Sequence, residues 1–147
     1  MKILSAAVCA AIIAMTAPAW AAEDRELVKM PAMMQEHMLT SMRDHLDVLN
    51  EILADIAAEK FTDAARVAES RLGTSSFGQH NAAHMAQFMP KGMQEAGTAL
   101  HRAASRFALA AEETDLDRSY KSVARLTGAL SEMTAACSAC HAGYRIR

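Results

Sequence analysis

The chain has 147 residues, an ordinary length for one domain, and its 15 Lys and Arg against 17 Asp and Glu leave a formal net charge of −2. Because the basic residues form no run or patch, nucleic acid and anionic membrane surfaces are excluded as expected partners. Hydrophobic residues make up 52% of the chain and aromatic residues only 5%, which disfavours β-sandwiches and barrels and favours helices.

Residues 1–21 are typical of a secretory signal peptide. Lys2 provides the positive start, residues 3–14 form an apolar stretch, and Ala19-Trp20-Ala21 is a small-x-small cleavage site. A membrane anchor is the competing interpretation, but the stretch is shorter than the ~20 residues that span a bilayer. We therefore expect export to the periplasm and a mature domain of residues 22–147. Without Lys2 the mature chain has 14 basic and 17 acidic residues, a net charge of −3.

The first long helix is predicted from Glu26 to about Ala58, with Pro31 near its start. Apolar residues recur there at steps of three and four, the spacing of one helical face: Met34, Met38, Met42, Leu46 (or His45), Leu49, Ile52, Leu53 and Ile56. A second, shorter helix is predicted to start at Phe61 with Thr62 as its N-cap and to stop at Gly73.

After a loop over residues 73–78, a short helix over 80–88 precedes a third long helix, from Pro90 to about Glu112. Its expected inner face is Met93, Ala96, Leu100, Ala103, Phe107 and Ala110. Thr114 and Asp117 form a weak capping box for a fourth helix, whose expected face is Leu116, Tyr120, Val123, Thr127, Leu130, Met133 and Cys137. The sequence therefore predicts an all-α fold, an antiparallel up-down four-helix bundle.

The chemically informative motif is Cys137-Ser138-Ala139-Cys140-His141, on the predicted last helix. Two thiols on adjacent turns can add to the two vinyl groups of haem, while the next residue supplies an imidazole to the iron. Export supports this interpretation, because c-type haem is attached outside the cytoplasm. We therefore expect one covalent haem c, attached through Cys137 and Cys140, with His141 as the proximal iron ligand.

Three other uses of the two cysteines are less consistent with the sequence. A thioredoxin-like Cys-x-x-Cys requires a βαβ context, which is absent. Structural zinc requires two further ligands of similar spacing. A plain disulfide fits an exported protein but leaves His141 unexplained.

The C-terminal run Cys137-x-x-Cys140-His141-x-x-Tyr144-Arg145, on the last helix of a predicted bundle, resembles the cytochrome c′ family of class II c-type cytochromes, with the low-spin c-556-like branch as the nearest type. The resemblance implies that His141 is the proximal ligand and that Tyr144 and Arg145 lie in the haem environment. It also implies a distal residue three positions after a Gln on the first helix, in an Arg-Gln-x-x-Met/Leu pattern. Gln35 and Met38 fit that pattern, whereas the family's propionate-binding Arg is replaced by Met34.

The sixth iron position separates two functions. A Met38 thioether on the iron suits one-electron transfer, and an open position suits binding of NO or CO. A methionine stripe at helical spacing is also ordinary core packing, so both roles are open for Met38. His37 and His45 are rival distal ligands, although their helix carries many charges.

A second cluster of His and Met, around His80, His84 and Met85, suggests copper binding. The alternative is that these side chains only pack over the end of the bundle. No Ser/His/Asp arrangement or phosphate loop is present, so we expect no enzyme. The expected function is one-electron transfer with His/Met ligation. The alternatives are gas binding and, after it, copper handling. Expected partners are a transient redox protein and a second copy of the chain.

Overall fold

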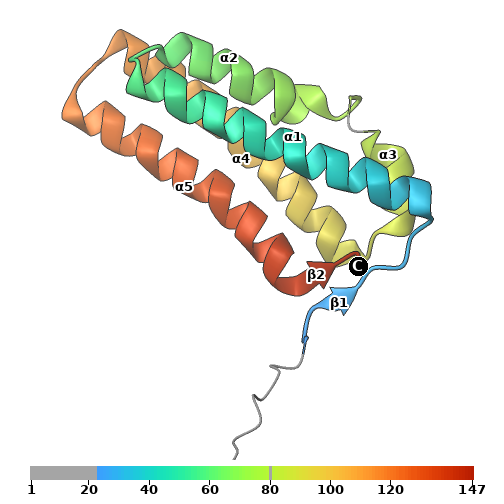
Figure 1. Ribbon diagram of the computed structural model, residues 1–147. Coiled ribbons are helices and arrows are strands. Elements are labelled where there is room, and N and C mark those ends of the chain that lie inside the picture. The colour runs from blue at the N-terminus through green and yellow to red at the C-terminus, as the bar shows by residue number, and fades with distance from the viewer. Residues whose placement is uncertain (1–22, 80) are drawn as a thin grey trace, which may run out of the picture.

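The computed structural model describes residues 23–79 and 81–147 (Figure 1). The predicted signal peptide, residues 1–21, and His80 lie outside the described residues. Apart from two strands of two residues each, the regular structure of the described chain is helical. The predicted all-α class is therefore confirmed.

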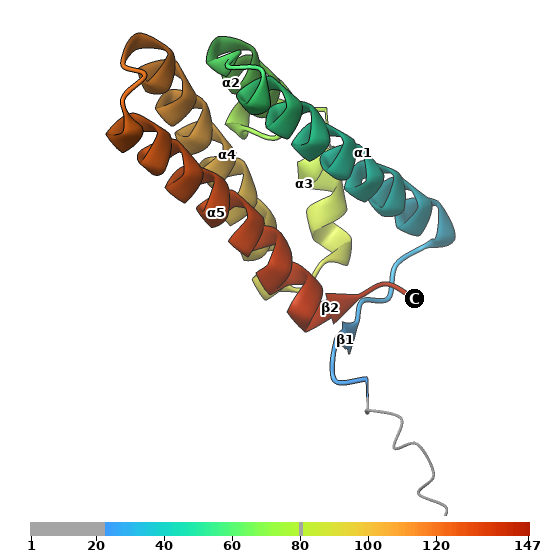
Figure 2. The ribbon, with the colours of Figure 1, turned by 60° about the vertical axis from the view of Figure 1, so that its left-hand side comes forward.

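Four long helices lie alongside one another: α1 (Ala32–Ala57), α2 (Phe61–Arg71), α4 (Lys91–Leu116) and α5 (Tyr120–Gly143) (Figure 1). Between α2 and α4 the chain forms the short helix α3 (Ala82–Met85), flanked by single 3-10 turns at Thr74–Ser76 and Ala86–Phe88. The most extensive contacts join α4 with α5, α2 with α4 and α1 with α2. Figure 2 shows α1 and α5 on two sides of the molecule, with α3 near the end where α1 begins.

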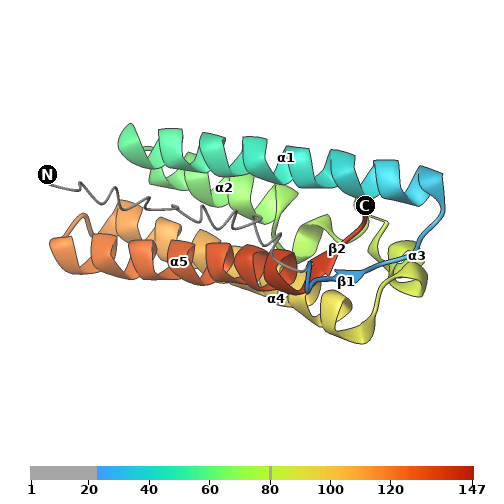
Figure 3. The same ribbon diagram turned by 60° about the horizontal axis from the view of Figure 1, so that its bottom comes forward.

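The predicted start of the first helix at Glu26 is wrong. Pro31 occupies the N-cap of α1 with an extended backbone, and a proline disfavours the helical conformation of the residue before it. The chain before Pro31 instead forms β1 (Glu26–Leu27), which pairs in parallel with β2 (Tyr144–Arg145) (Figure 3). The Val28 N–H donates to the Arg145 carbonyl at 2.8 Å. The N-terminal segment thus holds the chain that follows the Cys-x-x-Cys-His motif.

Both predicted helix caps are also wrong, because the side chains have other hydrogen-bond partners. Lys60 occupies the N-cap of α2, and the Thr62 hydroxyl donates to Asp115 at 3.0 Å. Thr114 lies inside α4, where its hydroxyl donates to the Ala110 carbonyl. Ser119 caps α5 by accepting the Ser122 N–H at 3.2 Å.

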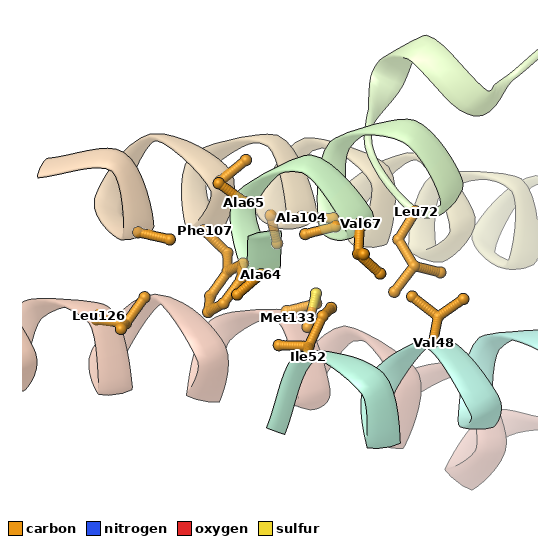
Figure 4. Close-up of a cluster of buried hydrophobic side chains, with 14 of the residues drawn as sticks. Val48, Ile52, Ala64, Ala65, Val67, Leu72, Ala104, Phe107, Leu126 and Met133 are labelled. Atoms are coloured by element: carbon orange, nitrogen blue, oxygen red, sulfur yellow. The ribbon is translucent and has the colours of Figure 1, made fainter. Parts of the chain in front are cut away.

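The buried core lies between α1, α2, α4 and α5, and Figure 4 shows its central side chains. Phe107 of α4 is fully buried and is surrounded by alanines of α2 and α4, whose small side chains allow close approach of the helices. The predicted inner face of the third helix is confirmed at Met93, Leu100, Ala103 and Phe107, which are all buried.

The predicted face of the fourth helix is wrong over its first half. Leu116 and Tyr120 are 90% and 89% exposed, and Val123 and Thr127 are exposed as well. The buried residues of α5 are Ser122, Leu126 and Met133. Leu116 ends α4 and Tyr120 begins α5, so both flank the turn between these helices.

Glu69 of α2 links the loop after α2 to α4. Its carboxylate accepts hydrogen bonds from the Ser105 hydroxyl at 2.5 Å and from the Ser75 N–H at 3.1 Å. Partial burial raises the pKa of Glu69, but the hydrogen bonds from Ser105 and Ser75 outweigh burial, and the net pKa lies below its ordinary value. The ionised form is therefore favoured by folding, so its contribution to stability is present at neutral pH and is lost as the pH falls through the lowered pKa.

We expect Ser105→Ala to lower the free energy of unfolding at pH 7 by about 1 kcal/mol, a value reduced for the partial exposure of this hydrogen bond to a charged group. The loss should be smaller at about pH 3.5, where most Glu side chains of the unfolded chain are protonated. Urea unfolding at both pH values measures it. Ser138→Ala is the control, because that exposed hydroxyl bonds only a carbonyl of its own helix. An equal loss at both pH values would contradict the role of Glu69.

Candidate functional site

A cavity of about 580 Å³ lies between α1, α4 and α5 and reaches the α3 segment. Its wall on α5 includes all three residues of the predicted haem motif, Cys137, Cys140 and His141. Its wall on α1 includes Met38, the predicted distal residue. The fold thus brings both halves of the predicted site, distant in sequence, to one cavity.

The α5 wall is made by the last turns of the helix. Three and four residues separate neighbours on one helical face, so Cys137, Cys140 and His141 can face the same space. Both cysteines are half-buried free thiols, and His141 is more exposed. Burial raises the pKa of each thiol, and the neighbouring Cys137 raises that of Cys140 further. The cavity is therefore lined by neutral S–H groups at neutral pH.

The α1 wall meets a group of side chains that we call the methionine cluster. The cluster consists of buried Val28, Met30, Met85 and Met93 with half-buried Met34, Met38, Phe88, Met89, Cys140, Tyr144 and Ile146. Met38 and Cys140 therefore pack in one cluster as well as lining one cavity. Met34 belongs to the cluster but does not line the cavity, whereas His37 and His45 line it.

Tyr144 and Arg145, predicted for the haem environment, do not line the cavity. Tyr144 is half-buried in the methionine cluster, and its hydroxyl lies where a Cβ on Gly92 would be placed. Arg145 has a buried Nε without a hydrogen-bond partner among the described residues. Tyr144 thus joins the same cluster as Cys140, and its hydroxyl occupies the space left by the missing side chain of Gly92.

Gly92→Ala should therefore lose about 1 kcal/mol relative to an unhindered alanine, because the added Cβ forces the Tyr144 hydroxyl, the far end of a half-buried side chain, to move. Inside a helix, alanine otherwise gains up to about 1 kcal/mol over glycine. Gly128→Ala in α5 is the matched control: apart from its chain neighbours and the nearby backbone of α5, no described atom lies within 4 Å of the added Cβ, so it should stabilise. Urea unfolding compares the two variants. Tyr144→Phe should restore most of the loss, and equal stability of both alanine variants would refute the packing argument.

The residues of the predicted copper site are distributed differently. His84 is exposed and its ring lies 5.5 Å from that of Phe88, whereas Met85 is 3% exposed in the methionine cluster. His80 lies outside the described residues. Over residues 23–79 and 81–147, no group of three or more His, Cys, Asp or Glu side chains is placed to hold a metal ion. Met85 and Met89 instead line the cavity.

His101 of α4 is a cavity residue that sequence reasoning missed. It is 7% exposed, and its Nδ1 lies 2.7 Å from the Leu72 carbonyl oxygen. Because a carbonyl can only accept, Nδ1 carries the proton and Nε2 is unprotonated in the neutral ring. The rings of Phe77 and His45 lie 4.5 Å and 6.5 Å from that of His101. The only sequence signal was its place next to Leu100 on the predicted inner face.

Comparisons with known proteins give no relative. No protein-family model matches the chain, and neither a curated protein nor a solved structure is significantly similar to it. In the part of the chain that the structure describes, no helix has the length and apolar character needed to cross a bilayer.

Proposed function

We propose that the protein is a c-type cytochrome that transfers single electrons and carries one haem c on Cys137 and Cys140. One observation supports this most directly: the three residues of the Cys-x-x-Cys-His motif and Met38 line opposite walls of one cavity of about 580 Å³. That volume lies within the range of cofactor and ligand sites, about 300–1,000 Å³.

The residues around the cavity fit the chemistry of haem. Most of its lining is apolar, which suits a flat porphyrin ring, and no Asp or Glu of the described residues lines it. Two thiols, an imidazole and a thioether are the groups that attach haem c and hold its iron. All four groups belong to side chains of this one cavity.

Each wall has a distinct role in the proposal. Cys137 and Cys140 would attach the haem to α5, and His141 of α5 and Met38 of α1 would hold its iron. When bound, haem supplies a one-electron iron couple. The apolar side chains of the methionine cluster exclude water near Met38, which favours the less charged, reduced state of the site.

The proposal extends to fold and location. We infer that the four long helices form the antiparallel up-down bundle of the cytochrome c′ family, that residues 1–21 direct export to the periplasm, and that the protein is not an enzyme. It would exchange electrons with a transient redox protein and pair with a second copy of the chain.

The test is an optical spectrum of the protein produced in cells that attach c-type haem. We expect a pyridine haemochrome spectrum of thioether-linked haem and a low-spin ferric spectrum with the weak long-wavelength band of a Met–iron bond. Absence of covalent haem would refute the whole proposal. A five-coordinate, high-spin spectrum would refute electron transfer through His/Met ligation.

The second candidate function is binding of NO or CO. It is supported by the extent of the cavity, which continues past Met38 along α1 to Leu46 and Leu49. A small apolar gas could reach the cavity along these apolar side chains. The high-spin spectrum named above is the result that would favour this function.

A further inference from the structure

The charged residues around the cavity are few and of one sign. Among the described residues, the only Asp, Glu, Lys or Arg side chains that line it are those of Arg43 on α1 and Arg147 beyond β2. The whole chain, in contrast, has more acidic than basic residues, 17 against 15. The cavity therefore offers two guanidinium groups and no competing carboxylate to a ligand with negative charge.

We propose that Arg43 and Arg147 bind the two propionate groups of the haem. This inference rests on the proposed function, because haem is the ligand that brings two carboxylates into an otherwise apolar site. A guanidinium presents a planar fork of N–H donors that matches a carboxylate, which makes arginine the preferred partner of such groups.

Both arginines line the cavity and are exposed to water. The Arg43 side chain is 60% exposed, and its Nη1 lies 3.5 Å from a carboxylate oxygen of Glu36, an exposed pair that costs little to exchange. Arg147 follows β2, which β1 holds through the pairing of Leu27 with Arg145. Because both guanidinium groups stay near water, neither pays a large cost of burial on binding.

The experiment uses the haem-loaded protein with Arg43→Gln and Arg147→Gln, and Arg66→Gln as the matched control. Arg66 is also exposed and paired within its own helix, with Asp63 at 3.2 Å, but it does not line the cavity. The first readout is the propionate bending band in resonance Raman spectra, which reports hydrogen bonds to these groups. The second is the midpoint potential.

We expect each cavity variant to shift the Raman band. We also expect each glutamine variant to lower the ratio of reduced to oxidised haem at a fixed potential about threefold, which corresponds to the free energy of one exposed ion pair. At 59 mV per tenfold for one electron, this corresponds to about 30 mV. Arg66→Gln should change neither readout. Arg43→Lys and Arg147→Lys keep the charge and should recover most of the potential but not the Raman band, because they lose the fork of donors.

Failure of this inference can be told apart from failure of the proposed function. If the parent protein carries no thioether-linked haem, the proposed function fails, and this inference with it. If the parent carries haem and neither glutamine variant shifts the Raman band, the arginines do not bind propionate and the function stands. A changed salt dependence of electron exchange without a Raman shift would also overturn the inference and assign the arginines to partner docking.

Discussion

The Cys137→Ala/Cys140→Ala variant should carry no covalent haem, the largest single effect we expect. Thioether formation adds each S–H across a vinyl double bond: the sulfur bonds to one vinyl carbon and the hydrogen to the other. In the proposal these two thioethers are the covalent bonds between the haem and the chain, so removing both sulfurs removes the attachment. Each single variant should keep one thioether and lose the other. Haem staining of a denaturing gel and the intact mass of the protein measure both results.

Ser138→Ala is the matched control for the cysteine variants. Ser138 lies between the two cysteines on α5 and lines the same cavity, but its side chain has no atom that can form a thioether. It should keep full covalent haem. Haem that survives denaturation of the double cysteine variant would show that another residue forms the bond, and would refute the motif assignment.

The sequence predicted the elements whose pattern is local and continuous. The face of α4 was predicted because Met93, Leu100, Ala103 and Phe107 are all packed against other helices, which preserves the helical period. The face of α5 was predicted only in part. Leu130 packs against the core, whereas Cys137 and Cys140 line the cavity, so the apolar stripe of α5 divides between core and ligand space.

The start of α1 was mispredicted for a different reason. The apolar spacing continues back to Leu27, but the restriction that Pro31 places on Met30 outweighs it, and the segment finds its hydrogen bonds in β2. That pairing joins the two ends of the described chain, and neither strand has a pattern of its own. No local signal in the sequence could have shown it.

The candidate site shows the same division. Cys137, Cys140 and His141 were found from spacing alone, and Met38 from a family pattern. His101, Gly92 and Arg43 carry no motif. His101 matters because it contacts the Leu72 carbonyl, Gly92 because it makes room for Tyr144, and Arg43 because it lines the cavity. These contacts form only when the helices pack.

Met38→Ala should change the iron site more than any other single distal substitution. If the Met38 thioether holds the sixth position, its removal leaves that position open, because an alanine methyl group cannot reach or bind the metal. We expect conversion from low-spin to high-spin ferric haem and a rise in CO affinity of about tenfold or more, equivalent to at least ~1.4 kcal/mol. Optical spectra and CO titration of the reduced protein measure the two effects.

Met42→Ala is the control that separates ligation from packing. Met42 lies one turn farther along α1, is half-buried like Met38 and lines the same cavity, so its truncation removes a similar volume of thioether from a similar place. A site held by Met38 should respond to the first substitution and keep its low-spin spectrum after the second. If Met38→Ala leaves CO affinity nearly unchanged, the sixth position was already open, and gas binding is the better account of this cavity.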